Sequence, residues 1–142
     1  MIRPFQFYID EKLVVKTPVN VSMAKALLQK AEIRLNRVKS NKIEEAETSI
    51  VFEDIYECLR EASQSLIELK GFKPYSHEAL VAFLKDYKML PDAAINIFDT
   101  YRILRNNSVY KAEKISLHKC LEALEFAKSI LPELAGKMKE II

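Results

Sequence analysis

Apolar residues recur at intervals of three and four along most of the chain, a spacing that places them on one face of an α-helix. The first such segment covers residues 21–39, and Asn20 precedes it as a suitable N-cap. A second, longer helix is predicted over residues 42–70, because Gly71 follows it at the position after a helix end that favours glycine. The sequence therefore begins its folded part with two amphipathic helices joined by a short polar connection.

Three further helices are predicted in the second half of the chain. Ser76 is the N-cap of a short helix over residues 77–88, and another helix follows over residues 92–107. The last helix is predicted to begin near residue 109 or 111 and to reach about residue 130. Pro132 then either kinks this helix or starts a last turn, because proline cannot donate a backbone hydrogen bond.

The first 18 residues have a different pattern. Apolar residues flank the polar run Asp10–Lys12, which predicts a short hairpin or an extended arm that ends at Pro18. The expected fold class is all-α: an antiparallel bundle of four main helices plus short helices. The bundle occupies residues 19–142, and the N-terminal arm occupies residues 1–18.

Helical periodicity also predicts which side chains form the core. The predicted core residues are Val51, Ile55, Leu59, Ala62, Leu66, Ile97, Phe98, Tyr101, Leu121 and Leu124. Ile43, Ala46 and Ile50 lie off the apolar arc of the second helix, so we expect them to meet the N-terminal arm or a second subunit. A homodimer that buries more than ~1,000 Å² in total is therefore predicted.

Composition narrows the class of protein. The 142 residues suit one domain, and the net charge of +2 lacks the basic excess of a strong nucleic-acid binder, so any basic surface must be local. Two glycines are too few for a glycine-rich phosphate loop. Cys58 and Cys120 have no partner spacing, which predicts buried reduced thiols and no metal site. The charged start and the absence of a long apolar run predict a cytoplasmic protein without a membrane helix. No cofactor is expected.

The residues that most suggest chemistry lie at the end of the fourth predicted helix. Arg105 continues the apolar face that carries Tyr101, where a partly buried guanidinium needs polar partners. The run Asn106–Ser108 follows, and it predicts a helix break because these side chains compete for backbone hydrogen bonds. A positioned cation beside amides suits a phosphate or carboxylate partner, and Arg102 extends the patch by one turn.

A purely structural interpretation also stands. In it, Arg105 pairs with Asp54 or Glu57 of the long second helix, and the polar run after it only ends a helix. The two histidines also have simple interpretations: His77 organises the loop or caps the short helix, and His118 lies on a solvated helix face. Nothing in the spacing pairs either histidine with Arg105.

Two stretches together resemble the HEPN (higher eukaryotes and prokaryotes nucleotide-binding) family. They are Gly71-Phe72-Lys73-Pro74-Tyr75-Ser76-His77 after the long helix, and Arg105-Asn106-Asn107-Ser108-Val109-Tyr110 later in the chain. Members of the family have a Gly-aromatic-basic loop, then Ser-His, then a helix that ends in an R-x4–6-H signature. The resemblance covers roughly residues 20–131. It implies an all-helical bundle that usually dimerises, with a polar cleft at the signature. Many members cleave RNA there without metal, while others bind nucleotides or pair with a minimal nucleotidyltransferase in a toxin–antitoxin module.

One position departs from the family pattern, because Tyr110 stands where the signature has histidine. A phenol titrates near pH ~10 and an imidazole near ~6.5, so Tyr110 is a poor general base, although it can stack on a nucleobase. Arg102, Arg105, Asn106 and Tyr110 are the expected nucleotide- or RNA-binding residues, and the last three are the candidate catalytic residues. The main expectation is a non-catalytic or weakly catalytic binding protein that acts beside a nucleotidyltransferase. The alternatives are an active metal-independent ribonuclease toxin and a helical interaction protein without enzymatic activity.

Overall fold

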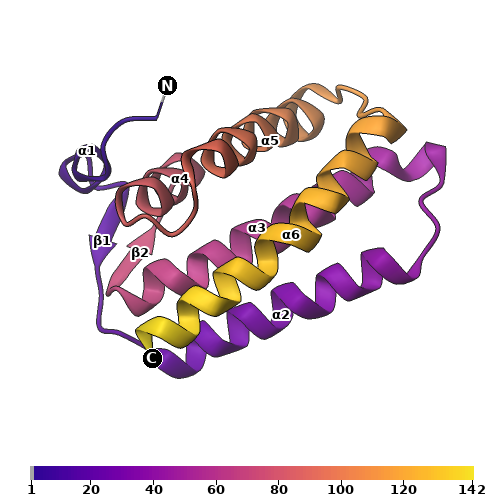
Figure 1. Cartoon of the computed structure of the whole chain (residues 1–142). Helices are drawn as coiled ribbons and strands as arrows, with labels where there is room; N and C mark the ends of the chain where they lie inside the picture. Colours follow the sequence, from indigo (N-terminus) through magenta and orange to yellow (C-terminus); the bar gives the residue numbers. More distant parts are fainter. Residues whose placement is uncertain (1) are drawn as a thin grey trace.

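Most of the chain forms helices, as its apolar periodicity predicts. The computed structural model describes residues 2–142, and over these residues it contains six α-helices, one 3₁₀ helix and two short strands (Figure 1). In chain order the elements are α1 (Phe5–Asp10), β1 (Val14–Lys16), α2 (Val21–Ser40), η1 (Glu45–Glu47), α3 (Thr48–Leu69), β2 (Phe72–Pro74), α4 (His77–Asp86), α5 (Asp92–Lys111) and α6 (Leu117–Ile141). Within residues 2–142, none of the helices has an apolar stretch that could span a lipid bilayer.

Two helices begin where their caps predict. The Asn20 side chain accepts a hydrogen bond of 2.9 Å from the backbone N–H of Met23 at the start of α2. The Ser76 hydroxyl accepts one of 3.4 Å from the N–H of Ala79 at the start of α4. Each cap satisfies a backbone donor that has no partner within the helix.

The start of the long second helix was predicted wrongly. The chain is extended at Glu44 and forms the 3₁₀ turn η1 before α3 begins at Thr48, not at residue 42. Thr48 is buried, and its hydroxyl donates a 2.6 Å hydrogen bond to the carbonyl oxygen of Ile115. This contact with a residue far along the chain fixes the start of the helix, so the local pattern around residue 42 does not reveal it.

The boundaries of the last two helices also differ from the prediction. α5 continues without a break through Asn106–Ser108 and ends at Lys111, where Ala112 adopts a left-handed conformation with φ of 52°. α6 begins after its N-cap Ser116 and runs past Pro132 to Ile141. The loss of one helical hydrogen bond at Pro132 is tolerated because the neighbouring Leu131 and Leu134 are buried in the core.

The N-terminal segment is neither an extended arm nor a local hairpin. Residues 5–10 form α1, in which Phe5 and Tyr8 are buried. The strand β1 pairs in antiparallel register with β2, which places Val14 opposite Pro74. The strands join residues about sixty positions apart, and Phe5 packs against Phe83 of α4. The local pattern of the first residues therefore predicts neither contact.

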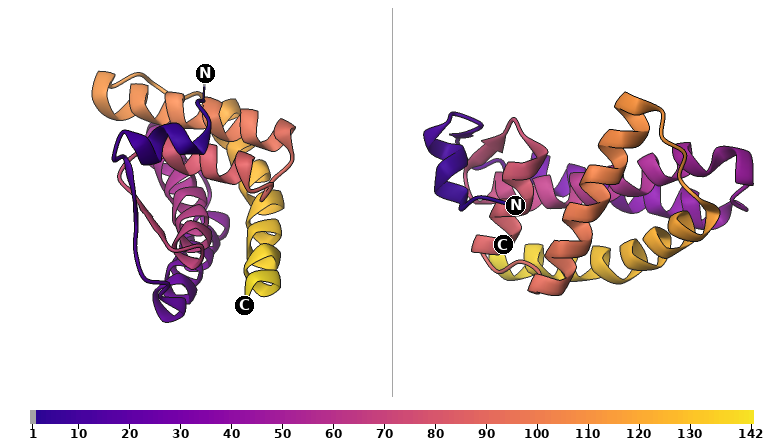
Figure 2. Two further views of the ribbon diagram at one scale, coloured as in Figure 1. Left: turned by 90° about the vertical axis from the view of Figure 1, so that its left-hand side faces the viewer. Right: turned by 90° about the horizontal axis from the view of Figure 1, so that it is seen from above.

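α3 is the helix around which the others are arranged. It contacts α2 and α6, which run alongside it, and it also contacts α4 and α5 (Figure 1). α5 crosses over this layer when the molecule is seen from above (Figure 2). The arrangement brings the start of α4 and the second half of α5 onto the same part of α3.

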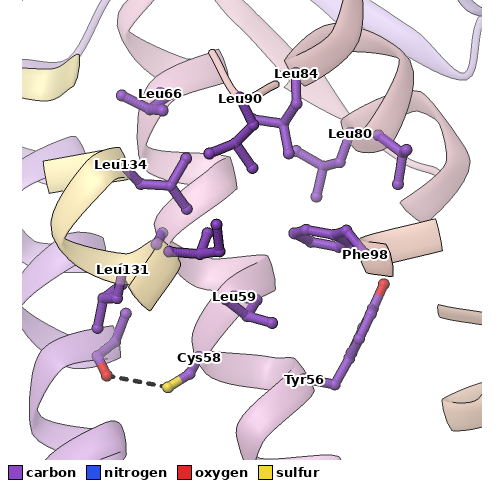
Figure 3. Packing of buried hydrophobic residues seen from close by; sticks show 14 of the residues in the cluster. Tyr56, Cys58, Leu59, Leu66, Leu80, Leu84, Leu90, Phe98, Leu131 and Leu134 are labelled. Atoms are coloured by element: carbon purple, nitrogen blue, oxygen red, sulfur yellow. Dashed lines mark hydrogen bonds between the residues drawn. The ribbon is translucent and has the colours of Figure 1, made fainter. Parts of the chain in front are cut away.

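The core lies between these helices (Figure 3). Of the predicted core residues, Ile55, Leu59, Ala62, Leu66, Phe98 and Tyr101 are buried, and Val51 and Leu124 are half-buried. The prediction was wrong for Ile97 and Leu121, which are 40% and 45% exposed and lie on the solvent-facing sides of α5 and α6. Both cysteines are buried and unpaired, as predicted, and the Cys58 thiol donates to the carbonyl of Ala31 at 3.3 Å.

Candidate functional site

A small hollow of about 240 Å³ lies between the start of α4 and the second half of α5. The α5 side of the hollow is lined by Arg102, Arg105, Asn106 and Tyr110, which are the four residues that the sequence singles out. The α4 side is lined by Ser76, His77 and Glu78. The structure therefore brings all of the predicted residues to one place and adds a histidine to them.

Arg105 is half-buried, and its head group faces aromatic rings and an amide. Its Nη1 donates to Oδ1 of Asn106 at 3.1 Å, and its Cζ lies 6.0 Å from the centre of the Tyr56 ring. Cζ also lies 5.9 Å from the centre of the Tyr110 ring. Within residues 2–142 Arg105 forms no ion pair, so most of its donors remain available to an anion.

The structural interpretation of Arg105 as a partner of Asp54 or Glu57 is wrong. Asp54 pairs instead with Arg34, at 3.5 Å. Glu57 accepts several hydrogen bonds from the guanidinium of Arg60, which lies one turn further along α3. Burial acts to raise the pKa of Glu57, but these hydrogen bonds hold it below its ordinary value, so the carboxylate is already matched to a cation.

Arg102 lines the hollow but is not free. Its Nε donates to Oδ1 of Asp99 at 2.7 Å, and its Nη1 lies 3.5 Å from Oε1 of Glu78. The Tyr8 hydroxyl donates to the other oxygen of Glu78 at 3.2 Å. Glu78 is thereby held at the edge of the hollow, and Arg102 offsets its charge, which leaves Arg105 as the cation available to a ligand.

His77 is the functional residue that sequence reasoning did not place in the site. Its Nδ1 lies 3.2 Å from the hydroxyl of Tyr56, and the two rings stack with 5.7 Å between their centres. Burial lowers the pKa of His77, and Arg105, Arg60 and Arg102 lower it further, with Glu57 acting in the opposite direction. His77 is therefore neutral near pH 7.

Tyr56 is the second residue that the sequence did not reveal. It lies on α3, is buried, and also packs edge-to-face against Phe98 with 5.8 Å between the ring centres. Burial raises the pKa of Tyr56, so its hydroxyl stays protonated, and it can either donate to His77 or accept from it. The Ser-His pair at the helix start was the only sequence signal for this cluster, and it does not show which residues of α3 and α5 lie opposite.

Tyr110 lies at the rim of the hollow and is 75% exposed. The sequence predicts a helix break after Arg105, in the run Asn106–Ser108, which separates Arg105 from Tyr110. The break is absent, and the prediction was wrong in this respect. Both side chains are long enough to meet from an unbroken helix, with Asn106 between them in the same hollow.

Comparisons with protein-family models, with curated proteins and with solved structures found no match for this chain.

Proposed function

We propose that this protein is HEPN-like and binds a phosphate-bearing ligand, a nucleotide or RNA, at Arg105. The observation that carries the proposal is the half-buried guanidinium of Arg105, which forms no ion pair within residues 2–142 and lies in an open hollow. The guanidinium lies beside the Asn106 amide and the Tyr110 ring, and its planar fork of donors suits bidentate binding of phosphate.

The neighbouring side chains suit a nucleotide better than a simple anion. Asn106 offers an amide beside the guanidinium, and Tyr110 offers an exposed ring at the rim on which a base can stack. The hollow is smaller than the ~300–1,000 Å³ of a typical small-molecule pocket, so we expect it to hold the phosphate and ribose, with the base outside it.

We further propose that α2, α3, α5 and α6 form the antiparallel four-helix bundle of the family. By the same resemblance, the protein acts in the cytoplasm beside a minimal nucleotidyltransferase, in a module of the toxin–antitoxin type. The proposed protein is also a homodimer. The apolar side chain of Ile50, which is 65% exposed, supports this, and it lies with Ile43 in an otherwise largely charged hollow of about 400 Å³ between α2 and the start of α3.

Binding of a fluorescently labelled single-stranded RNA, followed by anisotropy in the presence of EDTA, tests the function. Arg105→Ala is expected to weaken binding about tenfold or more, since a hydrogen-bonded charge contributes ~1.5–3 kcal/mol. Arg105→Lys is expected to restore binding only in part, because lysine lacks the planar fork. Lys25→Ala is the control, because Lys25 is an exposed cation on α2 that lines neither this hollow nor the one at Ile50. If Arg105→Ala binds as well as Lys25→Ala, or if the wild type binds neither RNA nor ATP in the same assay, the proposed function is wrong.

A further inference from the structure

The hollow beside Arg105 contains an acid–base group as well as a cation. His77 lines the hollow and its Nδ1 is occupied by the Tyr56 hydroxyl, so the nitrogen left for a ligand is Nε2. Tyr56 is 1% exposed and stacks on the imidazole, which fixes the orientation of the ring. Histidines oriented by a buried partner in this way are typical of proton transfer at a bound substrate.

The charges around His77 favour the form that accepts a proton. Burial lowers its pKa first, and the guanidinium groups of Arg105, Arg60 and Arg102 lower it further, while Glu57 opposes them. A neutral imidazole near pH 7 is the protonation state that a general base requires.

RNA supplies a nucleophile of its own beside every phosphodiester, the 2′-hydroxyl group. Cleavage at that bond needs a base for the hydroxyl proton and positive charge beside the non-bridging phosphate oxygens. Arg105 provides such a charge and His77 provides such a base in one hollow. A hollow of about 240 Å³ has room for one phosphodiester and its ribose.

We propose that His77 is the general base of an RNA cleavage reaction in this hollow, with Arg105 holding the phosphate and Tyr56 positioning the imidazole. This inference rests on the proposed function, because RNA must first bind at Arg105. Nε2 of His77 takes the proton of the 2′-hydroxyl, the 2′-oxygen bonds to phosphorus, and the bond from phosphorus to the 5′-oxygen breaks. The 5′-oxygen takes a proton from water at the open side of the hollow, and His77 returns its proton to the resulting hydroxide. The products are a 2′,3′-cyclic phosphate end and a 5′-hydroxyl end.

Tyr56 is a positioning residue in this reaction. In the tautomer that leaves a lone pair on Nε2, the Nδ1–H donates to the Tyr56 oxygen, and the same hydrogen bond persists when the ring becomes protonated. Tyr56→Phe keeps the aromatic packing but removes this acceptor, which destabilises the protonated ring. We therefore expect the variant to cleave more slowly and the rising limb of its pH–rate profile to move to lower pH. A residue that only supports the fold would leave that limb in place.

The test uses the full chain, a short labelled RNA and the same RNA with a single 2′-deoxy substitution at the cleaved position, all in EDTA. The wild type is expected to bind both and to cut only the first, giving cyclic phosphate ends. His77→Ala and His77→Gln are expected to lose ~10²–10⁴-fold in cleavage rate and to keep RNA binding. His118→Ala, which removes an exposed histidine on α6, is the control and is expected to cleave like the wild type.

The outcomes separate this inference from the proposed function. If the wild type binds the RNA but does not cut it in EDTA, the inference is overturned and the binding function stands. If either His77 variant cuts at the wild-type rate, His77 is not the base. If the wild type binds ATP but not RNA, this inference fails and the nucleotide-binding function stands, and if it binds neither ligand, both proposals fail. Should His77→Ala not fold, as judged by circular dichroism, His77→Gln and the pH–rate profile of Tyr56→Phe decide the question.

Discussion

The Ser108 hydroxyl donates a 2.8 Å hydrogen bond to Oε2 of Glu53, which ties the last turns of α5 to α3. Ser108 is 8% exposed, so the bond is largely shielded from water. It holds in helical form the stretch that carries Arg105, Asn106 and Tyr110, and it explains why the polar run after Arg105 does not end the helix.

We therefore expect Ser108→Ala to loosen the end of α5. The change removes a largely buried hydrogen bond to a carboxylate, and should lower the free energy of unfolding by ~1–3 kcal/mol. Urea denaturation followed by circular dichroism measures this loss. Ser40→Ala is the control, since the Ser40 hydroxyl bonds only to a carbonyl at the exposed end of α2. Equal stabilities of the two variants would show that the Ser108–Glu53 bond does not hold the helix.

Sequence reasoning succeeds in this protein where the determining contacts are local. Asn20 and Ser76 cap their helices within three residues, and both helix starts are predicted correctly. The start of α3 depends on Thr48 and Ile115, and the continuity of α5 depends on Glu53, so local patterns give wrong boundaries there.

The candidate site shows the same division between local and distant determinants. The α5 residues of the hollow could be found from one short stretch of sequence, because they lie within nine positions of each other. His77 and Tyr56 belong to two other helices, and only the packing of α3, α4 and α5 brings them to Arg105. The sequence shows a histidine and a tyrosine at these positions, but it does not show that both side chains lie close to Arg105.

Phe98 and Ile97 are adjacent on α5 and provide a matched test of the core. Phe98 is 1% exposed and Ile97 is 40% exposed. Phe98→Ala should cost ~3–5 kcal/mol of unfolding free energy, because it leaves a cavity beside Tyr56. Ile97→Ala should cost much less, since half-exposed side chains lose little burial when truncated. Thermal or urea unfolding gives both values, and a larger loss for Ile97→Ala would contradict the packing described above.

The stability of the protein should depend on the protonation of His77. Burial and the arginines Arg105, Arg60 and Arg102 lower the pKa of His77 in the folded state, while in the unfolded chain it lies near ~6.5. The unfolded state therefore binds more protons as the pH falls below ~6.5, and the free energy of unfolding decreases over that range until the folded-state pKa is passed. Above pH ~6.5, where His77 is neutral in both states, it contributes no pH dependence to the free energy of unfolding. Urea unfolding at a series of pH values should show this decrease in the wild type and a smaller one in His77→Gln, and identical profiles would refute the assignment.

The proposed dimer has its own test at Ile50. This residue is 65% exposed and lines the hollow between α2 and the start of α3 together with Ile43. Ile50→Glu should convert a dimer into a monomer, because the interface would desolvate a new carboxylate that shares the hollow with Glu47 and Asp54. Ile33→Glu is the control, as Ile33 is 56% exposed on α2 and does not line this hollow. Sedimentation equilibrium that gives only a monomer for the wild type at micromolar concentration would exclude the dimer.

The last prediction concerns Tyr110, which stands where the family signature has histidine. Its ring centre lies 5.9 Å from Cζ of Arg105, so an imidazole at this position would face the same bound phosphate. Tyr110→His is expected to raise RNA cleavage in EDTA above the wild-type level, by ~10-fold or more if the added group acts as an acid or base. Tyr110→Phe is the control, because it keeps a ring for stacking but supplies no titratable group near pH 7.

The double variant His77→Ala/Tyr110→His connects this prediction to the role of His77. If both positions face one phosphodiester, the new imidazole should restore part of the cleavage that His77→Ala loses, with the same 2′,3′-cyclic phosphate ends. Rescue by position 110 would also show that the lost activity was due to a missing base, since a disturbed α4 would not be repaired by a change at the rim of α5. If Tyr110→His binds RNA as the wild type does but changes cleavage in neither background, position 110 does not face the reacting phosphate, and the resemblance to the family signature has no catalytic meaning in this chain.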